Sequence, residues 1–330
     1  MTRHVLGVDA GGTKTVAAVA DEDGNVLGVG ASGPGNADGA GVEAVGRSLR
    51  EAVGAARQSA GGVTIDAGFV GAAGVLLERD RVRTRAMLEP ELEDAVASVE
   101  VDHDGRGALA GALSGRPGLL LIAGTGSFCF GRDQAGHEAH ASGWGSLFGD
   151  EGSAYWVAVE GVRAALAGQD GRGEPTSLGD VLFGRLGVTG GEELLSRTGT
   201  GAWSRSEIAG LAPFVVGEAE AGDAAAAGVV RRGVAELARA ARAVSGRLGF
   251  GGPVEIAGTG GLFNSRYVWD ALVAQLAVTL PPATLVRPEL PPVLGSVLVA
   301  VAGLRSVTPA ELPAGVLSAL RQAAATHRAL

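Results

Sequence analysis

Cysteine, lysine and aromatic residues are scarce in this chain of 330 residues. The single cysteine, Cys129, excludes an internal disulfide and any metal or iron–sulfur site built from several cysteines of one chain. Lys14 is the sole lysine, so arginine supplies the other basic side chains. Aromatic residues make up only 4% of the chain. Alanine, valine and leucine must therefore form most of the core.

Long apolar runs and a surplus of positive charge are also absent. The longest apolar stretch, residues 293–304, is too short for a membrane span and is expected to be a buried helix. Asp9 interrupts the first apolar run, so no signal peptide is expected. The net charge of −9 and the pI of about 5.1 argue against a nucleic-acid-binding protein. We therefore expect a cytoplasmic protein with neither membrane nor nucleic acid as a partner.

Glycine, by contrast, is abundant, with 56 residues. Collagen is excluded because the glycines follow no three-residue period. A mean hydropathy of +0.24 and a charged fraction of 19% disfavour disorder. The composition therefore predicts a globular protein with many glycine turns.

The apolar segments predict two similar halves, each opening with strands joined by a glycine turn. The first half is expected to contain strands at 4–9, 15–20, 25–31, 66–73 and 98–102, and helices at 39–60 and 105–114. The second is expected to contain strands at 118–124, 128–132, 138–142 and 253–257, and helices at 151–167, 205–219, 223–249, 265–279, 293–304 and 309–328. This alternation indicates an α/β fold.

The first glycine turn follows a strand that ends near Asp9. Its backbone N–H groups and side chains can surround a phosphate, and the residues in question are Gly11, Gly12, Thr13 and Lys14. Asp9 can hold Mg²⁺ through water molecules. The alternative interpretation is a plain β-hairpin with a glycine bulge.

Two further glycine turns occur in the second half. One contains Gly124, Thr125 and Gly126, and the other contains Gly258, Gly260 and Gly261. Turns from the two halves can face each other around the phosphates of a nucleotide, with the third turn against the adenosine. A G-x-G-x-x-G match at 28–33 is interpreted as coincidental, because Pro34 follows it and no helix begins there.

The motifs resemble those of the N-acetylglucosamine kinase branch of the BadF/BadG/BcrA/BcrD ATPase family, within the actin–hexokinase–Hsp70 superfamily. The resemblance rests on DAGGTKT (9–15), GPGN (33–36), IAGTGS (122–127), SGWGSLFGDEGSAYW (142–156) and GTGG (258–261). It implies an α/β fold of two ribonuclease-H-like, actin-like ATPase lobes with an interlobe active-site cleft. The first lobe is expected at 1–115, with the C-terminal helix at 306–330 packing back on it, and the second at 116–305.

The resemblance also implies an activity. An enzyme of this kind uses ATP and Mg²⁺ to phosphorylate a small-molecule sugar, here most simply N-acetylglucosamine to its 6-phosphate, and relatives are often homodimers. Glucosamine, N-acetylmuramic acid or another hexose are alternative substrates. A different class, the ATPase activator of a reductase or dehydratase, is disfavoured because such activators carry cluster-binding cysteines and this chain has only Cys129.

The catalytic base implied by the resemblance is Asp104, placed at a strand end directly before a helix. Such a carboxylate can accept the proton of the attacking sugar hydroxyl. Asp102 is the competing candidate, and a simple helix cap is the alternative role for Asp104. His103 stands where the family usually has asparagine.

Five residues match the sugar-binding positions of the family, namely Asn36, Ser127, Trp144, Gly145 and Asp150. Carboxylate and amide groups suit the vicinal hydroxyls of a sugar, and Trp144 either stacks on the sugar or packs inside the protein. Phe128 stands where related kinases carry asparagine, which bears on the preference for an acetamido group.

Overall fold

The chain forms two compact units, each built around its own sheet. The computed structural model describes residues 2–35, 41–75, 77–92, 98–198, 201 and 203–327. Unit 1 comprises residues 1–118 and 288–330, and unit 2 comprises residues 119–287. The chain therefore leaves unit 1, completes unit 2 and then returns.

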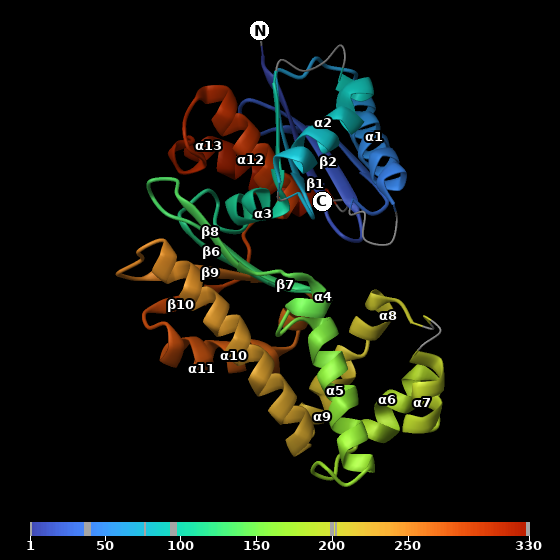
Figure 1. The fold of residues 1–330 in the computed structure, drawn as a ribbon. Helices are drawn as coiled ribbons and strands as arrows, with labels where there is room; N and C mark the ends of the chain where they lie inside the picture. The colour runs from blue at the N-terminus through green and yellow to red at the C-terminus, as the bar shows by residue number, and fades with distance from the viewer. Residues whose placement is uncertain are drawn as a thin grey trace. The chain divides into compact units, whose positions relative to one another are not determined.

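The sheet of unit 1 has five strands in the order β3-β2-β1-β4-β5 (Figure 1). The strands are β1 (His4–Ala10), β2 (Thr15–Asp21), β3 (Val26–Ser32), β4 (Ala67–Ala72) and β5 (Val99–His103). The first three are antiparallel to one another, whereas β4 and β5 run parallel to β1. The strands expected in this half are thus all present.

Helices cover both faces of this sheet. They are α1 (Val42–Ser59), α2 (Glu78–Leu92), α3 (Asp104–Ala112), α12 (Pro292–Arg305) and α13 (Ala314–Thr326), with a 3₁₀ turn η2 (Pro309–Glu311). Successive strand residues alternate between two cores: Val5 belongs to the core that includes α12, and Leu6 to the one that includes α1. Gly7 lies directly against the backbone of Val297, so α12 approaches the sheet too closely for any side chain there.

The sheet of unit 2 has the order β10-β9-β6-β7-β8, the same topology as unit 1 when read from β8. Its strands are β6 (Gly118–Ala123), β7 (Ser127–Arg132), β8 (Glu138–Ser142), β9 (Val254–Thr259) and β10 (Ala283–Val286). The prediction of two similar halves is therefore confirmed, although β10 had not been expected.

Eight α-helices and one 3₁₀ helix are described in unit 2, and the α-helices are labelled in Figure 1. They are α4 (Gly145–Phe148), α5 (Ala154–Gln169), α6 (Leu178–Leu186), α7 (Gly191–Thr198), α8 (Arg205–Ala209), α9 (Ala212–Glu220), α10 (Ala224–Arg247), η1 (Gly261–Asn264) and α11 (Arg266–Thr279). One continuous core joins the sheet to these helices, with Leu119, Cys129 and Val244 among its members. The single helix expected at 205–219 is two helices, because the chain turns between Gly210 and Leu211.

The chain returns to unit 1 earlier than the sequence indicated. The predicted second lobe extended to residue 305, whereas residues 288–305 belong to unit 1. The physical reason is α12, which is buried on nearly all sides and packs on β1, β4 and α3. Such a helix requires a sheet face as its partner. In the part of the chain that the structure describes, no helix is both long and apolar enough to cross a membrane.

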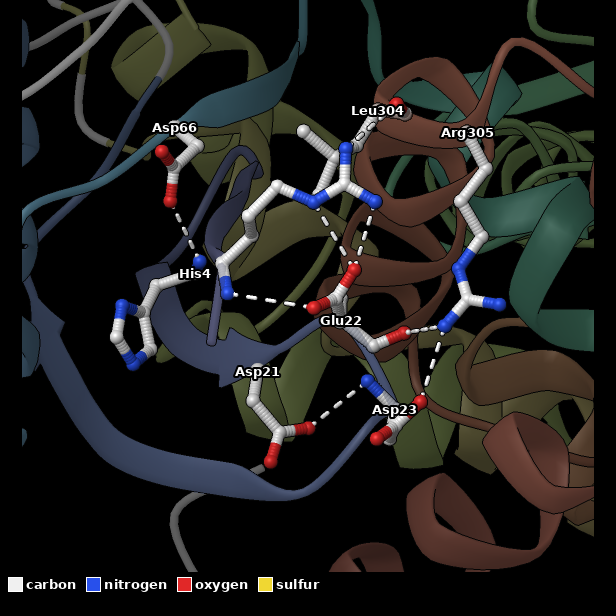
Figure 2. A network of polar contacts seen from close by, with 8 residues as sticks. His4, Asp21, Glu22, Asp23, Asp66, Leu304 and Arg305 are labelled. Atoms are coloured by element: carbon white, nitrogen blue, oxygen red, sulfur yellow. Dashed lines mark hydrogen bonds and ion pairs between the residues drawn. The ribbon is translucent and has the colours of Figure 1, made fainter. Parts of the chain in front are cut away.

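Polar contacts fasten the returning segment to the start of the chain (Figure 2). Arg305, the last residue of α12, donates to the carbonyl of Glu22 at 2.7 Å and to the carboxylate of Asp23 at 3.0 Å. Asp66 accepts the backbone N–H of His4 at 2.8 Å, which joins the start of β1 to the segment before β4. Both ends of the chain therefore contribute to unit 1.

Hydrogen bonds to Glu289 form a second link between segments at the point where the chain returns to unit 1. Its carboxylate accepts hydrogen bonds from Ser114 at 2.6 Å, from Arg116 at 2.7 Å and from Arg321. Its backbone N–H donates to the carbonyl of Ala112. We call Glu289, Ser114, Arg116 and Arg321 the return cluster, because it joins the segment that leaves unit 1 to the segment that re-enters it.

Candidate functional site

The first glycine turn is a tight hairpin at the end of β1. The N–H of Gly11 donates to the carbonyl of Lys14 at 3.0 Å, and the N–H of Gly35 donates to the carbonyl of Gly11 at 2.9 Å. Gly12, Thr13 and Lys14 are exposed. The turn therefore presents backbone N–H groups and one ammonium to solvent.

The fold of unit 1 gives no reason for glycine at positions 11 and 12. Among the described residues, a Cβ atom at Gly12 would meet no heavy atom within 4 Å, and one at Gly11 would make only an ordinary contact. Neither residue has the positive φ that a glycine bulge would require. Glycine here leaves room for close approach of a ligand to the backbone, which favours the phosphate-binding interpretation over the plain hairpin.

Two largely buried carboxylates lie near this turn, at the ends of β1 and β5, the two strands that flank β4. Asp9 is in the last part of β1, and Asp104 begins α3 directly after β5. Burial raises the pKa of Asp104, although the backbone N–H of Gly105 partly opposes this shift. Burial and the charge of Asp104 together raise the pKa of Asp9 to about 7, with Lys14 acting in the opposite direction. The nearby positive charge therefore does not fully offset burial and the repulsion between these two carboxylates.

A divalent cation could bind this pair of carboxylates only if water molecules or phosphate oxygens supply its remaining ligands. Across the described ranges, no three His, Cys, Asp or Glu side chains gather to hold a metal directly. Mg²⁺ commonly keeps several waters and binds through one or two carboxylates together with phosphate oxygens. Asp9, with Asp104 beside it, matches that donor set, and the mutual repulsion of the two carboxylates would be relieved by the cation.

Asp102, the competing candidate for the base, is neutralised by arginines. Its carboxylate accepts hydrogen bonds from Arg81 at 2.7 Å, from Arg106 at 2.9 Å and from the backbone N–H of His103 at 2.8 Å. Burial acts to raise its pKa, but these hydrogen bonds outweigh burial and hold the pKa below its ordinary value. A carboxylate with this many donors is a poor proton acceptor.

The second and third glycine turns lie side by side in unit 2, because β6 and β9 are parallel neighbours. Gly260 has φ +110°, and a Cβ atom there would clash with the backbone of Ala123. A Cβ at Gly258 would lie 2.9 Å from the ring of Trp269. These two glycines are therefore required by packing.

Gly124 and Gly261 differ from them, since a Cβ atom at either would meet no atom of the described ranges within 4 Å. Gly124 closes the second turn by donating to the carbonyl of Gly126 at 3.0 Å, and its own carbonyl accepts from Ala154 at the start of α5. Thr125, at the tip, is partly exposed. The second and third turns thus each contain a glycine that leaves space for a ligand.

Asp150 connects the second turn to the motif that follows β8. It is 3% exposed and has φ +59°, which is uncommon for a residue other than glycine. Its carboxylate accepts the backbone N–H groups of Ser127 and Gly145 and a hydrogen bond from Arg205. Burial raises its pKa, and Arg205 opposes this rise. The hydroxyl of Ser127 donates to the carbonyl of Glu151 at 2.8 Å.

The aromatic side chains near this motif form a row of rings that ends at the exposed Trp144. Trp144 is 63% exposed, with its ring centroid 6.0 Å from that of His140. Phe128 lies 5.8 Å from His140, so the three rings follow one another along β7, β8 and the start of α4. The exposed face of Trp144 is compatible with stacking on a sugar. Asn36 lies outside the described residues, so its predicted role stays a prediction.

Three arginines complete these arrangements and were missed from sequence. Arg81 and Arg106 hold Asp102, and Arg205 holds Asp150. The Ser204 and Glu207 capping box does mark the start of α8. No local pattern, however, connects Arg205 with an acidic residue 55 positions earlier.

Known proteins resemble this chain over much of its length. The chain is 29% identical over 304 residues to the N-acetylmuramic acid/N-acetylglucosamine kinase of Clostridium acetobutylicum, covering 90% of this chain and 98% of the relative. It is 29% identical over 233 residues to the N-acetyl-D-glucosamine kinase of Dictyostelium discoideum, covering 66% and 72%. The crystal structure of a candidate N-acetylglucosamine kinase from Chromobacterium violaceum matches with a TM-score of 0.70 and 25% identity, over 90% of this chain and 98% of that one.

The family comparison covers most of the chain. The sequence profile of the BadF/BadG/BcrA/BcrD ATPase family matches residues 6–300. This range includes all three glycine turns, the carboxylates Asp9, Asp102 and Asp104, and the motif around Asp150. The chain belongs to the BadF/BadG/BcrA/BcrD ATPase family.

Proposed function

We propose that this protein is an ATP-dependent kinase that phosphorylates an amino sugar, converting N-acetylglucosamine to its 6-phosphate. Support comes from the family and from relatives named as kinases of N-acetylglucosamine and N-acetylmuramic acid. N-acetylmuramic acid, glucosamine and another hexose are the alternative acceptors. Phe128, in place of a polar residue, makes the choice among acceptors a matter for experiment.

The observation that carries the proposal is the contrast between two neighbouring aspartates. Asp102 is occupied by two arginines and a backbone N–H. Asp104 has no arginine partner within the described part of the chain, and burial raises its pKa. A carboxylate with a raised pKa at a helix start is suited to accept a proton.

In the proposed reaction, a hydroxyl oxygen of the sugar attacks the γ-phosphorus of ATP, and the bond to the β–γ bridging oxygen breaks so that ADP leaves. Asp104 accepts the hydroxyl proton. The N–H groups of the glycine turns and the ammonium of Lys14 donate to phosphate oxygens. Mg²⁺ held by Asp9 and its waters supplies charge neutralisation of the phosphates when bound.

Acceptor recognition is proposed for the positions that match the family motif. Asp150 offers carboxylate oxygens, Gly145 offers backbone at the start of α4, and Trp144 offers an exposed ring. The Ser127 hydroxyl already donates to Glu151 and retains acceptor capacity. Asn36 completes the proposed set.

The deciding experiment measures ATP consumption with N-acetylglucosamine, N-acetylmuramic acid, glucosamine and glucose, each with Mg²⁺. We expect an amino sugar to stimulate turnover. The Asp104→Asn variant is expected to bind ATP normally and to lose turnover by at least about 100-fold, because general-base catalysis contributes on that order. The matched control is Asp270→Asn, a surface carboxylate that is 62% exposed.

Turnover that no sugar stimulates would contradict the kinase proposal. Substantial turnover in the Asp104→Asn variant would instead move the base to another residue while leaving the kinase activity in place. A cytoplasmic location and a homodimer also remain proposals, which cell fractionation and sedimentation equilibrium would test.

A further inference from the structure

Arg205 is placed at a site that the motifs did not indicate. It is the first residue of α8, whose start is fixed by the capping box of Ser204 and Glu207. Its guanidinium forms an ion pair with the carboxylate of Asp150, and it lies 5.9 Å from the ring of Tyr155. The Arg205 side chain is about one third exposed and that of Asp150 almost fully buried.

The Arg205–Asp150 ion pair packs closely against Gly126 in the second glycine turn. A Cβ atom at Gly126 would lie 2.9 Å from Nη2 of Arg205 and 3.0 Å from Oδ2 of Asp150. Gly126 is therefore the residue that permits the guanidinium and the carboxylate to reach the turn. This contact places the charge of Arg205 beside the proposed phosphate and sugar positions of unit 2.

The hydrogen bonds of the pair are only partly satisfied. Asp150 accepts from the N–H groups of Ser127 and Gly145 and from Arg205, which leaves lone-pair capacity on its two oxygens. The Nε atom of Arg205 is buried and has no hydrogen-bond partner among the residues that the structure describes. A buried N–H without a partner is costly and is commonly satisfied by a ligand or water. The arrangement thus has an acceptor and a donor left for a substrate.

We propose that Arg205 is a positioning residue of the acceptor-sugar site, which holds Asp150 ionised and oriented toward the sugar hydroxyls. The inference rests on the proposed function and adds a residue and a role to it. Without a guanidinium, burial and the nearby charge of Glu151 would favour the protonated form of Asp150. A protonated carboxyl has lost part of its capacity to accept hydrogen bonds from hydroxyl groups.

The test compares Arg205→Met, Arg205→Lys and wild type in steady-state kinetics, with N-acetylglucosamine and ATP varied separately. In Arg205→Met we expect the KM for the sugar to rise about 10-fold or more, because a hydrogen bond to a charged group is lost. The KM for ATP is expected to stay within about twofold. Arg205→Lys keeps the charge without the planar fork and is expected to fall between the other two.

A double variant and a control separate this role from general destabilisation. If Arg205 acts through Asp150, then Asp150→Asn combined with Arg205→Met raises the KM for the sugar no further than Asp150→Asn alone. Arg266→Met is the matched control, since Arg266 is 93% exposed and forms an ion pair with the surface residue Asp270. Thermal unfolding of each variant shows whether the fold persists.

Three outcomes would overturn the inference. They are an unchanged KM for the sugar in Arg205→Met, an equal rise in both KM values, and additive effects in the double variant. A wild-type protein that no sugar stimulates would overturn the proposed function and this inference together. A stimulated wild type with an unaltered Arg205→Met variant would overturn this inference alone.

Discussion

At the scale of single residues, the glycines of the three turns divide into two kinds. Gly258 and Gly260 are required by packing, since any side chain there would clash with Trp269 or with the backbone of Ala123. Gly12 and Gly124 are surrounded by open space. Sequence alone does not separate the two kinds, because all of them occur in the same short motif type.

The division predicts opposite effects of alanine at Gly124 and Gly260. Gly124→Ala is expected to leave the free energy of unfolding nearly unchanged and to raise the KM for ATP several-fold, because the new methyl group occupies the space left for phosphate. Gly260→Ala is expected to destabilise the protein by about 1–3 kcal/mol through its positive φ and the clash. Chemical denaturation and kinetics measure the two effects, and a stability loss in Gly124→Ala would contradict the assignment.

Lys14 provides the second prediction at this scale. It is exposed in the first turn and is the sole lysine of the chain. Lys14→Ala is expected to raise the KM for ATP about tenfold, since a charge-assisted hydrogen bond to phosphate is lost. Lys14→Arg keeps the charge and is the control. Equal kinetics in the alanine variant and wild type would remove Lys14 from the phosphate site.

The sequence indicated two candidate bases, and the structure distinguishes them through residues that no motif contains. The family motif favours Asp104, which stands directly before the helix, and leaves Asp102 as the competitor. The difference arises because Arg81, on a helix 21 positions earlier, and Arg106 both reach Asp102. The candidate residues of the site were thus predictable from motif spacing, whereas their ionic partners depend on tertiary contacts.

At the scale of elements, the strands were predicted well and several helices were not. Apolar runs between glycine turns mark nine of the ten strands, since a buried strand needs such a run. Helix α2 was missed because it is polar around most of its surface. Of its residues 78–88, Thr84 and Leu88 are the buried ones. Helices α6 and α7 were missed because they are short, and α6 also contains two glycines.

The return cluster around Glu289 predicts a pH dependence of stability. Burial opposes ionisation, but hydrogen bonds from Ser114, Arg116 and Arg321 prevail and lower the pKa of Glu289 to about 2 from 4.5. Because the folded-state pKa is the lower one, the stabilisation is complete above pH 4.5 and is lost as the pH falls toward 2.

Replacing this side chain isolates the effect. Glu289→Gln is expected to lower the free energy of unfolding by about 2 kcal/mol at pH 7, after allowing for partial solvent exposure of the pair. The difference between wild type and variant should shrink as the pH is lowered from 5 to 3. Urea denaturation across that range measures it, and a difference that stays constant would contradict the shifted pKa.

At the scale of the whole molecule, one topology is used twice. Each unit has a sheet with three antiparallel strands and two parallel ones, and each places a glycine turn between its first two strands. This repeat was predictable because hydrophobic patterning and turns recur in both halves. The division of the chain was less predictable, since α12 lies far in sequence from the sheet that it covers.

Ligand binding gives the prediction for the whole molecule. MgADP at about 100 times its Kd should stabilise the protein by about 2.7 kcal/mol and raise the unfolding temperature by several degrees. Asp104→Asn should retain this increase, because the base is not proposed to bind the nucleotide. A thermal unfolding series with and without MgADP measures it, and an unfolding temperature unaffected by nucleotide would contradict ATP binding.

The insertion of unit 2 within unit 1 also sets an order of events during synthesis. Residues 119–287 form one continuous stretch, so unit 2 has its complete chain while residues 288–330 are still to be made. Until then, the face of β1 and β4 that carries Val5 and Phe69 lacks α12, its main covering helix. The half of the protein that the ribosome starts first is therefore the half that finishes last, and its apolar sheet face is the surface that the nascent chain must protect from aggregation.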